Sequence, residues 1–140
     1  MSYKYHKTIM NGAEKLIDGI ENIEMFLDDE DAWNFHDSSI YSFNWDRDER
    51  IFTVIVEPLG FSPDIDGWDG ESTILLDFHF EGCIEVHMNH LDLWSPQYIS
   101  EISISKVKGG LECWFDGYPI MVCSERLRVD KPRYIETKMT

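Results

Sequence analysis

The feature that most constrains the fold is a two-residue alternation of apolar and polar side chains, which recurs from about residue 40 onward. Successive side chains of a β-strand point to opposite faces, so this period is typical of strands with one buried face. The alternating runs lie at residues 41–45, 51–59, 74–80, 84–88, 98–107, 111–115 and 118–123. The sequence therefore predicts a protein dominated by β-structure.

Short polar segments between these runs predict antiparallel neighbours. The DRDER segment at 46–50 separates the first two runs, which we interpret as a hairpin, and Asp116-Gly117 is a strong hairpin signal between alternating runs. Gly109-Gly110 predicts another turn, while Glu81-Gly82 leaves open either two strands or one bent strand. With a short strand expected at 126–129, the sheet should contain about six to eight strands.

The N-terminal part follows a helical period instead. Apolar residues there are spaced alternately four and three residues apart, at Ile9, Ala13, Leu16, Ile20, Ile23 and Leu27. This spacing predicts an amphipathic helix over about residues 8–27, although Gly19 in its interior costs about 1 kcal/mol relative to alanine. The expected fold class is α+β and β-dominant. In this fold we expect the helix to pack on a largely antiparallel, twisted sheet over about residues 39–130, and residues 131–140 to form a tail.

The stretch WNFHDSSI at 33–40 lies where the helical period changes to the strand period. We expect a hinge over 33–38, with Trp33, Phe35 and Ile40 entering the core and the Asp37 carboxylate accepting backbone N–H groups. A His-Asp pair also occurs in two-metal phosphohydrolases, but those sites are presented on helices, whereas His36-Asp37 leads into strands.

Length and charge restrict the class of protein and of partner. A chain of 140 residues is the size of one domain, with 27 acidic and 12 basic residues and a formal net charge of −15. This charge disfavours direct binding of nucleic acids and anionic membranes, and it either favours a basic partner or simply keeps the protein in solution. No apolar run approaches the ~20 residues of a membrane span, and none follows the N-terminus as in a signal peptide. We therefore expect a cytoplasmic protein.

Catalytic motifs are absent from the sequence. Cys83, Cys113 and Cys123 are odd in number and lack CxxC spacing, which predicts reduced, mostly buried thiols. There is no GxSxG motif, no cysteine beside a histidine motif, and no glycine-rich phosphate loop between a strand and a helix. We expect neither catalytic residues nor a cofactor.

The long loop LGFSPDIDGWDGE at 59–71 is the best candidate for an exposed site. A calcium loop counted from Asp64 fails, because Asp69 replaces the required glycine and Leu75 the required glutamate. A protein contact fits better, with an aromatic anchor and carboxylates that meet a basic surface. The alternative is a solvated loop with its tryptophan folded back onto the sheet. The predicted contact residues are Asp64, Asp66, Trp68, Asp69 and Glu71, supported by Asp28, Asp29, Glu30 and Asp31.

A metal site is the alternative that the histidines raise. His79, His87 and His90 alternate with carboxylates on predicted strands, and imidazole with carboxylate suits zinc or iron. Asp77 or Glu85 would complete the set. The spacing matches no zinc signature, so the main expectation is that no metal is bound.

Three segments together resemble the immunity protein 50 family of bacterial polymorphic toxin systems. They are FHDS within the hinge, LLDFHFEGCIEV, and the ending GGLECWFDG followed by IMVCSERLRV, and the resemblance covers residues 33–129. The family motif falls on Phe35, His36, Asp37 and Ser38, and on Phe80, Glu81 and Gly82. The resemblance implies a small cytoplasmic protein that binds and neutralises a cognate toxin.

Three functional hypotheses follow. The first is a toxin-neutralising protein with an acidic, aromatic surface, whose charge would speed encounter with a basic toxin such as a nuclease. The second is a small metal-dependent hydrolase or ligand-binding protein that uses His36, Asp37 and the histidine set. The third is a scaffold domain that forms a homodimer through a sheet edge.

Overall fold

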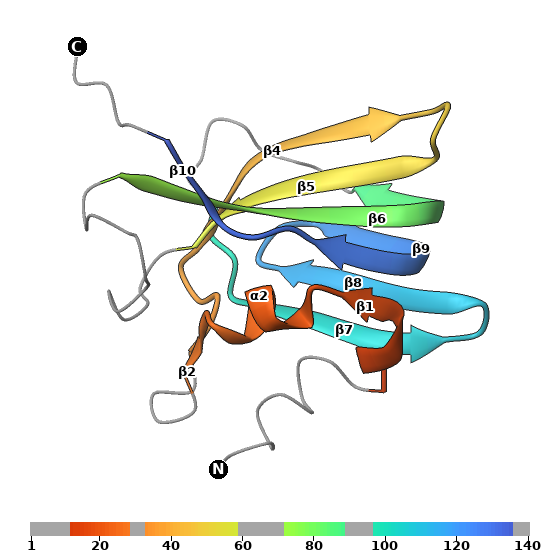
Figure 1. The fold of residues 1–140 in the computed structure, drawn as a ribbon, viewed down its shortest axis with the longest axis horizontal. Coiled ribbons are helices and arrows are strands. Elements are labelled where there is room, and N and C mark those ends of the chain that lie inside the picture. Colours follow the sequence, from red (N-terminus) through yellow and green to blue (C-terminus); the bar gives the residue numbers. More distant parts are fainter. Residues whose placement is uncertain (1–11, 29–32, 59–71, 89–96, 136–140) are drawn as a thin grey trace.

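The main element of the protein is an antiparallel sheet of eight strands (Figure 1). The computed structural model describes residues 12–28, 33–58, 72–88 and 97–135. Six strands form the sheet in the order β4-β5-β6-β9-β8-β7, while β1 pairs with β9 and β10 pairs with β6. The β-dominant, largely antiparallel architecture is therefore confirmed. The strands are β1 (Ile17–Asp18), β4 (Ser39–Asp46), β5 (Ile51–Glu57), β6 (Thr73–Met88), β7 (Glu101–Val107), β8 (Gly110–Asp116), β9 (Ile120–Val129) and β10 (Arg133–Ile135).

The predicted turns lie where the sequence placed them, with two refinements. Residues 47–50 connect β4 to β5, and residues 117–119, which begin with Gly117, connect β8 to β9. β6 is one long strand whose register shifts between Cys83 and Glu85, so the bent-strand alternative is the correct one. The predicted tail contains β10, which continues the pairing of β9 along β6.

The predicted helix over 8–27 is wrong within the described residues. From residue 12 the chain forms a 3-10 turn (η1, Glu14–Leu16), then β1, then a short helix (α2, Ile20–Glu24). Gly19 interrupts the pattern with a φ of 85°, and a Cβ at this position would lie 2.1 Å from the carbonyl oxygen of Val129. Asn22 Nδ2 donates a hydrogen bond to that same oxygen (2.9 Å). Backbone pairing and close packing against β9 thus replace the helical turns.

The N-terminal segment still buries the residues that suggested a helix. Ala13, Ile17 and Ile23 belong to the core. Beyond α2, a two-stranded sheet forms between β2 (Leu27–Asp28) and β3 (Trp33–Asn34). In the part of the chain that the structure describes, no helix is long and apolar enough to cross a membrane.

Aromatic rings occupy the centre of the core on the inner face of the sheet. Phe115 meets Phe78 and Phe80 in edge-to-face contacts, with ring centroids 5.8 and 6.1 Å apart. Phe35 from the hinge lies 6.2 Å from Phe78 and 6.0 Å from Phe26. The hinge is therefore packed into the same core, as predicted for Phe35, and Ile40 packs partly buried against it.

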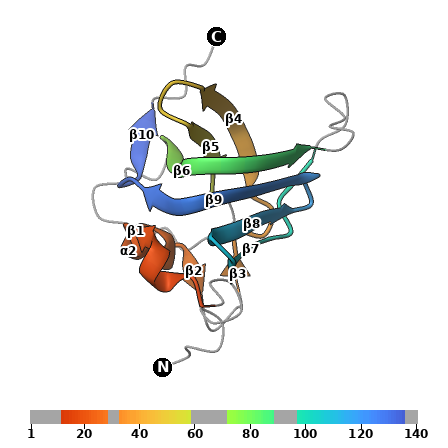
Figure 2. The same ribbon diagram turned by 90° about the vertical axis from the view of Figure 1, so that its right-hand side faces the viewer.

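The sheet curves until the segments that lead into its two edge strands meet (Figure 2). Ser38, just before β4, forms an isolated bridge with Ile99, just before β7, and Ile99 N–H donates to the Ser38 carbonyl (2.7 Å). The Tyr118 hydroxyl reinforces the junction by donating to the Gln97 carbonyl and accepting from Ile40 N–H. The hinge thus determines how the sheet closes upon itself at this end.

Asp37 acts in this junction through its backbone. Its N–H donates to Ile99, whereas its carboxylate is 70% exposed and lies 2.9 Å from His36 Nδ1. The expectation that the carboxylate accepts backbone N–H groups is not met among the described residues, where it contacts His36 instead. The turn has positive φ angles at Phe35 (59°) and Asp37 (68°). Aspartate tolerates this conformation better than most residues, while a bulky Phe there is uncommon.

Candidate functional site

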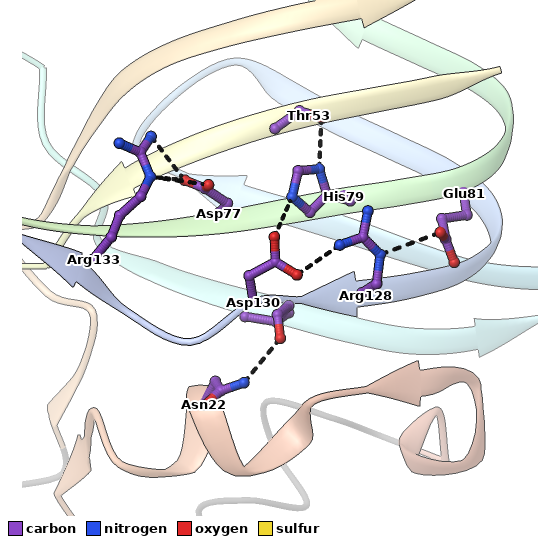
Figure 3. A network of polar contacts seen from close by, with 9 residues as sticks. Asn22, Thr53, Asp77, His79, Glu81, Arg128, Asp130 and Arg133 are labelled. Carbon is purple, nitrogen blue, oxygen red and sulfur yellow. Dashed lines mark hydrogen bonds and ion pairs between the residues drawn. The ribbon is translucent and has the colours of Figure 1, made fainter. Parts of the chain in front are cut away.

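One candidate site is a group of polar side chains on the outer face of the sheet, which we call the outer polar cluster. Thr53 on β5, His79 on β6 and Arg128 on β9 are register partners and form one row across three strands. Their neighbours along each strand are buried in the core, so these residues project from the opposite face. The cluster comprises Thr53, Asp77, His79, Glu81, Arg128, Asp130 and Arg133 (Figure 3).

His79 lies at the centre of the cluster and is held at both ring nitrogens. Its Nδ1 lies 2.9 Å from Thr53 Oγ1, and its Nε2 lies 2.8 Å from Asp130 Oδ2 (Figure 3). In a neutral ring, one nitrogen donates and the other accepts, and both contacts suit that arrangement. Only 18% of the side chain is exposed. The imidazole is therefore fixed in orientation with one edge reachable from solvent.

Guanidinium groups hold the carboxylates of the cluster. Arg128 donates to Asp130 Oδ1 (2.6 Å) and to Glu81 Oε2 (3.3 Å), and Arg133 Nε contacts Asp77 Oδ2 (3.1 Å). Partial burial lowers the pKa of Arg128, but hydrogen bonds to Glu81 and Asp130 and the charges of both carboxylates outweigh it and raise that pKa above its usual value. The cluster is thus close to electrically balanced.

Three of these residues could hold a metal ion. Asp77, His79 and Asp130 each offer a ligand atom, and the three atoms lie within 4.8 Å of one another. The sequence pointed to His79 with Asp77. It missed Asp130, which follows β9 and reaches the site only through the pairing of β9 with β6.

The predicted histidine set does not form one site. His79 is opposite Arg128, whereas His87 is opposite Met121 farther along the same strand, where it contacts Glu85. β6 stays extended through its bend, so the two imidazoles lie far apart, and His90 is outside the described residues. The predicted combination of His79 with His87 is therefore corrected.

The second candidate site is an apolar groove of about 620 Å³ between the end of β4 and the second half of β6. Trp45, Ile84 and Met88 contribute to its wall while remaining 48%, 59% and 39% exposed. The lining residues are Trp45, Arg47, Arg50, Phe52, Cys83, Ile84, Glu85, Val86 and Met88. We call this surface the β4–β6 groove.

The β4–β6 groove exists because β5 is shorter than its neighbour. The paired residues of β5 and β6 end at Ile51 and Glu81, and Cys83 N–H then donates to the Arg50 carbonyl (2.9 Å). β6 continues to Met88, and its last residues pair with β9 alone among the described strands. One backbone edge of residues 84–88 therefore borders the groove.

Charged residues surround the rim of the groove. Arg47, Arg50 and Glu85 line it, and the adjoining turn adds exposed Asp46, Asp48 and Glu49. The lining itself thus carries two arginines and one glutamate, while further acidic residues lie in the neighbouring turn.

The cysteines are poor nucleophiles. Cys83, Cys113 and Cys123 are all free, and the first two are buried, as predicted. Burial raises the pKa of all three thiols, and that of Cys113 rises furthest. Cys83 contacts the groove as a neutral, apolar side chain.

Most of the predicted contact surface lies outside the described residues. This applies to residues 59–71, with Asp64, Asp66, Trp68, Asp69 and Glu71, and to Asp29, Glu30 and Asp31, whereas Asp28 ends β2.

The residues of the family motif are spread over the fold. Phe35 and Phe80 are buried, Glu81 contacts Arg128, and Gly82 adopts a φ of 63° at the bend of β6, where a Cβ would collide with the Glu125 side chain.

Comparisons with protein families, with curated proteins and with solved structures found no match for this chain.

Proposed function

We propose that this protein is a toxin-neutralising immunity protein that binds a cognate, basic bacterial toxin in the cytoplasm. The observation that carries the proposal is the clustering of exposed Trp45, Ile84 and Met88 around the β4–β6 groove. Exposed apolar patches that include a tryptophan and adjoin charged residues are typical of protein-binding surfaces.

Along residues 84–88, one edge of β6 has no strand beside it among the described residues, and this edge supplies a second type of contact. Residues 84–88 carry backbone donors and acceptors beside an apolar groove, which is the arrangement that binds an extended segment of a partner by strand addition. Backbone hydrogen bonds would contribute affinity, and the pocket would select the side chains. The partner segment we expect is an extended strand with an apolar residue facing Trp45.

Charge supports the choice of a basic partner. The chain carries a net charge of −15. Although the groove lining contains two arginines and only Glu85 as an acid, exposed Asp46, Asp48 and Glu49 lie in the turn that adjoins it. An acidic surface accelerates encounter with a basic protein, and this acceleration weakens as salt increases.

The resemblance of the hinge and of the LLDFHFEGCIEV segment to immunity proteins supports a toxin as the partner. Under this proposal the chain has no catalytic residues, and it inhibits by occupying the toxin surface.

The test is co-expression with the product of the adjacent reading frame, followed by binding measurements with the purified pair. The proposal predicts that this product is toxic alone and harmless with the immunity protein. Trp45→Ala should weaken binding about 10- to 100-fold, as expected for a hot-spot tryptophan. Trp114→Ala is the matched control, because this side chain is equally exposed (45%) but lies on β8 outside the groove.

Two results would contradict the proposal. One is a neighbouring product that neither harms cells nor binds this chain. The other is equal binding by the two tryptophan variants, which would place the contact elsewhere. If the wild type forms a homodimer that the Trp45→Ala variant does not form, the groove serves self-association instead.

A further inference from the structure

We infer that Asp77, His79 and Asp130 form a binding site for a divalent transition-metal ion such as Zn²⁺, on the outer face of the sheet. This site is separate from the β4–β6 groove and does not depend on the proposed function. The inference rests on the positions of the ligand atoms, on the partner of the second imidazole nitrogen, and on the way the two arginines contact the carboxylates.

The ligand atoms are already gathered at near-coordination distances. His79 Nε2 and Asp130 Oδ2 lie 2.8 Å apart, and the three ligand atoms of the site lie within 4.8 Å of one another. Ligand atoms bound tetrahedrally to one ion at about 2.0–2.2 Å lie roughly 3.3–3.6 Å apart. Side-chain movements of roughly 1 Å would therefore bring all three onto one ion.

Thr53 orients the imidazole for this role. A metal-binding histidine commonly donates its other ring N–H to an oxygen, which fixes the tautomer and the ring plane. Thr53 Oγ1 lies 2.9 Å from His79 Nδ1 and can accept that hydrogen bond when Nε2 takes the ion. Because Thr53 and His79 are register partners on neighbouring strands, backbone pairing maintains this contact.

The arginines leave room for an ion but oppose its charge. Arg128 donates to Oδ1 of Asp130, so Oδ2 stays directed at His79. Arg133 contacts both oxygens of Asp77 at 3.1–3.4 Å, and its side chain is nearly half exposed on the short strand β10. An incoming ion must displace Arg133 from one oxygen. Removing this guanidinium should therefore strengthen metal binding.

The donor set selects the kind of ion. One imidazole and two carboxylates suit Zn²⁺, Mn²⁺ or Fe²⁺, whereas Mg²⁺ prefers oxygen ligands and retains its waters. Three protein ligands on a partly exposed surface leave the remaining coordination positions to water.

The experiment is calorimetric titration of the untagged, full-length chain with Zn²⁺, and with Mg²⁺ as a comparison. The wild type should bind one Zn²⁺ saturably and Mg²⁺ far more weakly. His79→Ala should abolish that binding, and Thr53→Val should weaken it about 10-fold, because valine cannot hydrogen-bond to the imidazole and orient it. Arg133→Gln should strengthen it several-fold, an increase that a loss of folding cannot imitate.

His87→Ala is the matched control, since His87 also contacts a carboxylate on β6 but has no third ligand among the described residues. Its titration should equal that of the wild type, and thermal melts should show that all variants fold. Cobalt substitution supplies a second measurement, because ligation without cysteine gives no thiolate-to-cobalt charge-transfer absorption. The inference is overturned if the wild type shows no saturable Zn²⁺ binding, if His79→Ala binds as the wild type does, if Arg133→Gln weakens binding, or if thiolate absorption appears.

Discussion

The main-chain nitrogen of Asp37 donates a hydrogen bond to the carbonyl oxygen of Ile99, 2.8 Å away, and this bond joins the chain entering β4 to the chain entering β7. These two strands are the opposite edges of the six-strand path. The neighbouring bridge between Ser38 and Ile99 continues the same contact. A short turn with two positive φ angles therefore holds the curvature of the entire sheet at one end.

Substitutions of Asp37 should distinguish backbone conformation from carboxylate chemistry. Asp37→Gly should leave the free energy of unfolding within about 0.5 kcal/mol of the wild type, because glycine accepts a φ of 68°. Asp37→Ala should lower it by about 1 kcal/mol, since alanine lacks the short polar side chain that lets aspartate tolerate that conformation. Urea denaturation measures both. An equal loss in the two variants would show that the carboxylate itself stabilises the turn.

Gly19 and Gly109 form a matched pair for testing the approach of the N-terminal segment to β9. Both have a φ of 85°, but a Cβ at Gly19 would meet the Val129 carbonyl oxygen, whereas one at Gly109 meets nothing within 4 Å. Gly109→Ala should cost about 1 kcal/mol from conformation alone. Gly19→Ala should cost at least about 2 kcal/mol more, because the backbone must shift. Thermal unfolding that gives equal losses would mean that this segment is not packed on β9.

The outer polar cluster should contribute measurably to stability even without metal. Asp130→Ala removes the acceptor of both His79 and Arg128, so in the presence of a chelator we expect the free energy of unfolding to fall by about 1 kcal/mol, a modest value because the carboxylate is partly exposed. Asp48→Ala is the control. Its carboxylate lies 3.9 Å from Arg47 Nε with both side chains almost fully exposed, and stability should not change. Chemical denaturation of both variants measures this difference. If the two variants give the same unfolding curve, the outer polar cluster does not stabilise the fold.

Stability should decline at alkaline pH partly because of Cys113. Burial raises the pKa of this thiol well above its usual value of 9.0, and the charge of Asp116 adds to the shift. Above pH 9 the unfolded chain loses the thiol proton while the folded chain retains it, so the free energy of unfolding falls by up to about 1.4 kcal/mol per pH unit. Below pH 9 this thiol adds no pH dependence. Cys113→Ala should flatten the decline between pH 9 and 10.5 in urea titrations, and an unchanged slope would contradict the buried, neutral thiol.

The strands were predictable because one-sided burial leaves a direct record in the sequence. Alternation identified β5, β6, β7, β8 and β9 in this way, and Asp116-Gly117 located a turn. The sequence of β4 also alternates, although its side chains from Tyr41 to Asp46 are all exposed. The N-terminal helix was mispredicted because its apolar spacing reports only which residues are buried. Ile17 is buried through pairing with Leu127 on β9, and that long-range contact is invisible in a local pattern.

The candidate sites were harder to predict than the fold. Asp77 and His79 alternate on one strand, which the sequence reveals, but Asp130 joins them only through the register of β9 on β6. The β4–β6 groove forms because β5 ends before β6 does. The alternation of apolar and polar residues in the sequence does not predict this difference in strand length. The one available signal was the unbroken alternation of β6 beyond Gly82.

The long strand β6 also determines when the chain can fold. Its principal partner is β9, with Met88 paired to Ile120 and Phe78 paired to Val129. Because the residues of the β7–β8 hairpin lie between β6 and β9 in the sequence, they must be synthesised before this central ladder can close. Local hairpins such as β4–β5 can form early, because few residues separate their strands. During synthesis, β6 therefore leaves the ribosome before β9, and the central ladder can close only after β9 has followed.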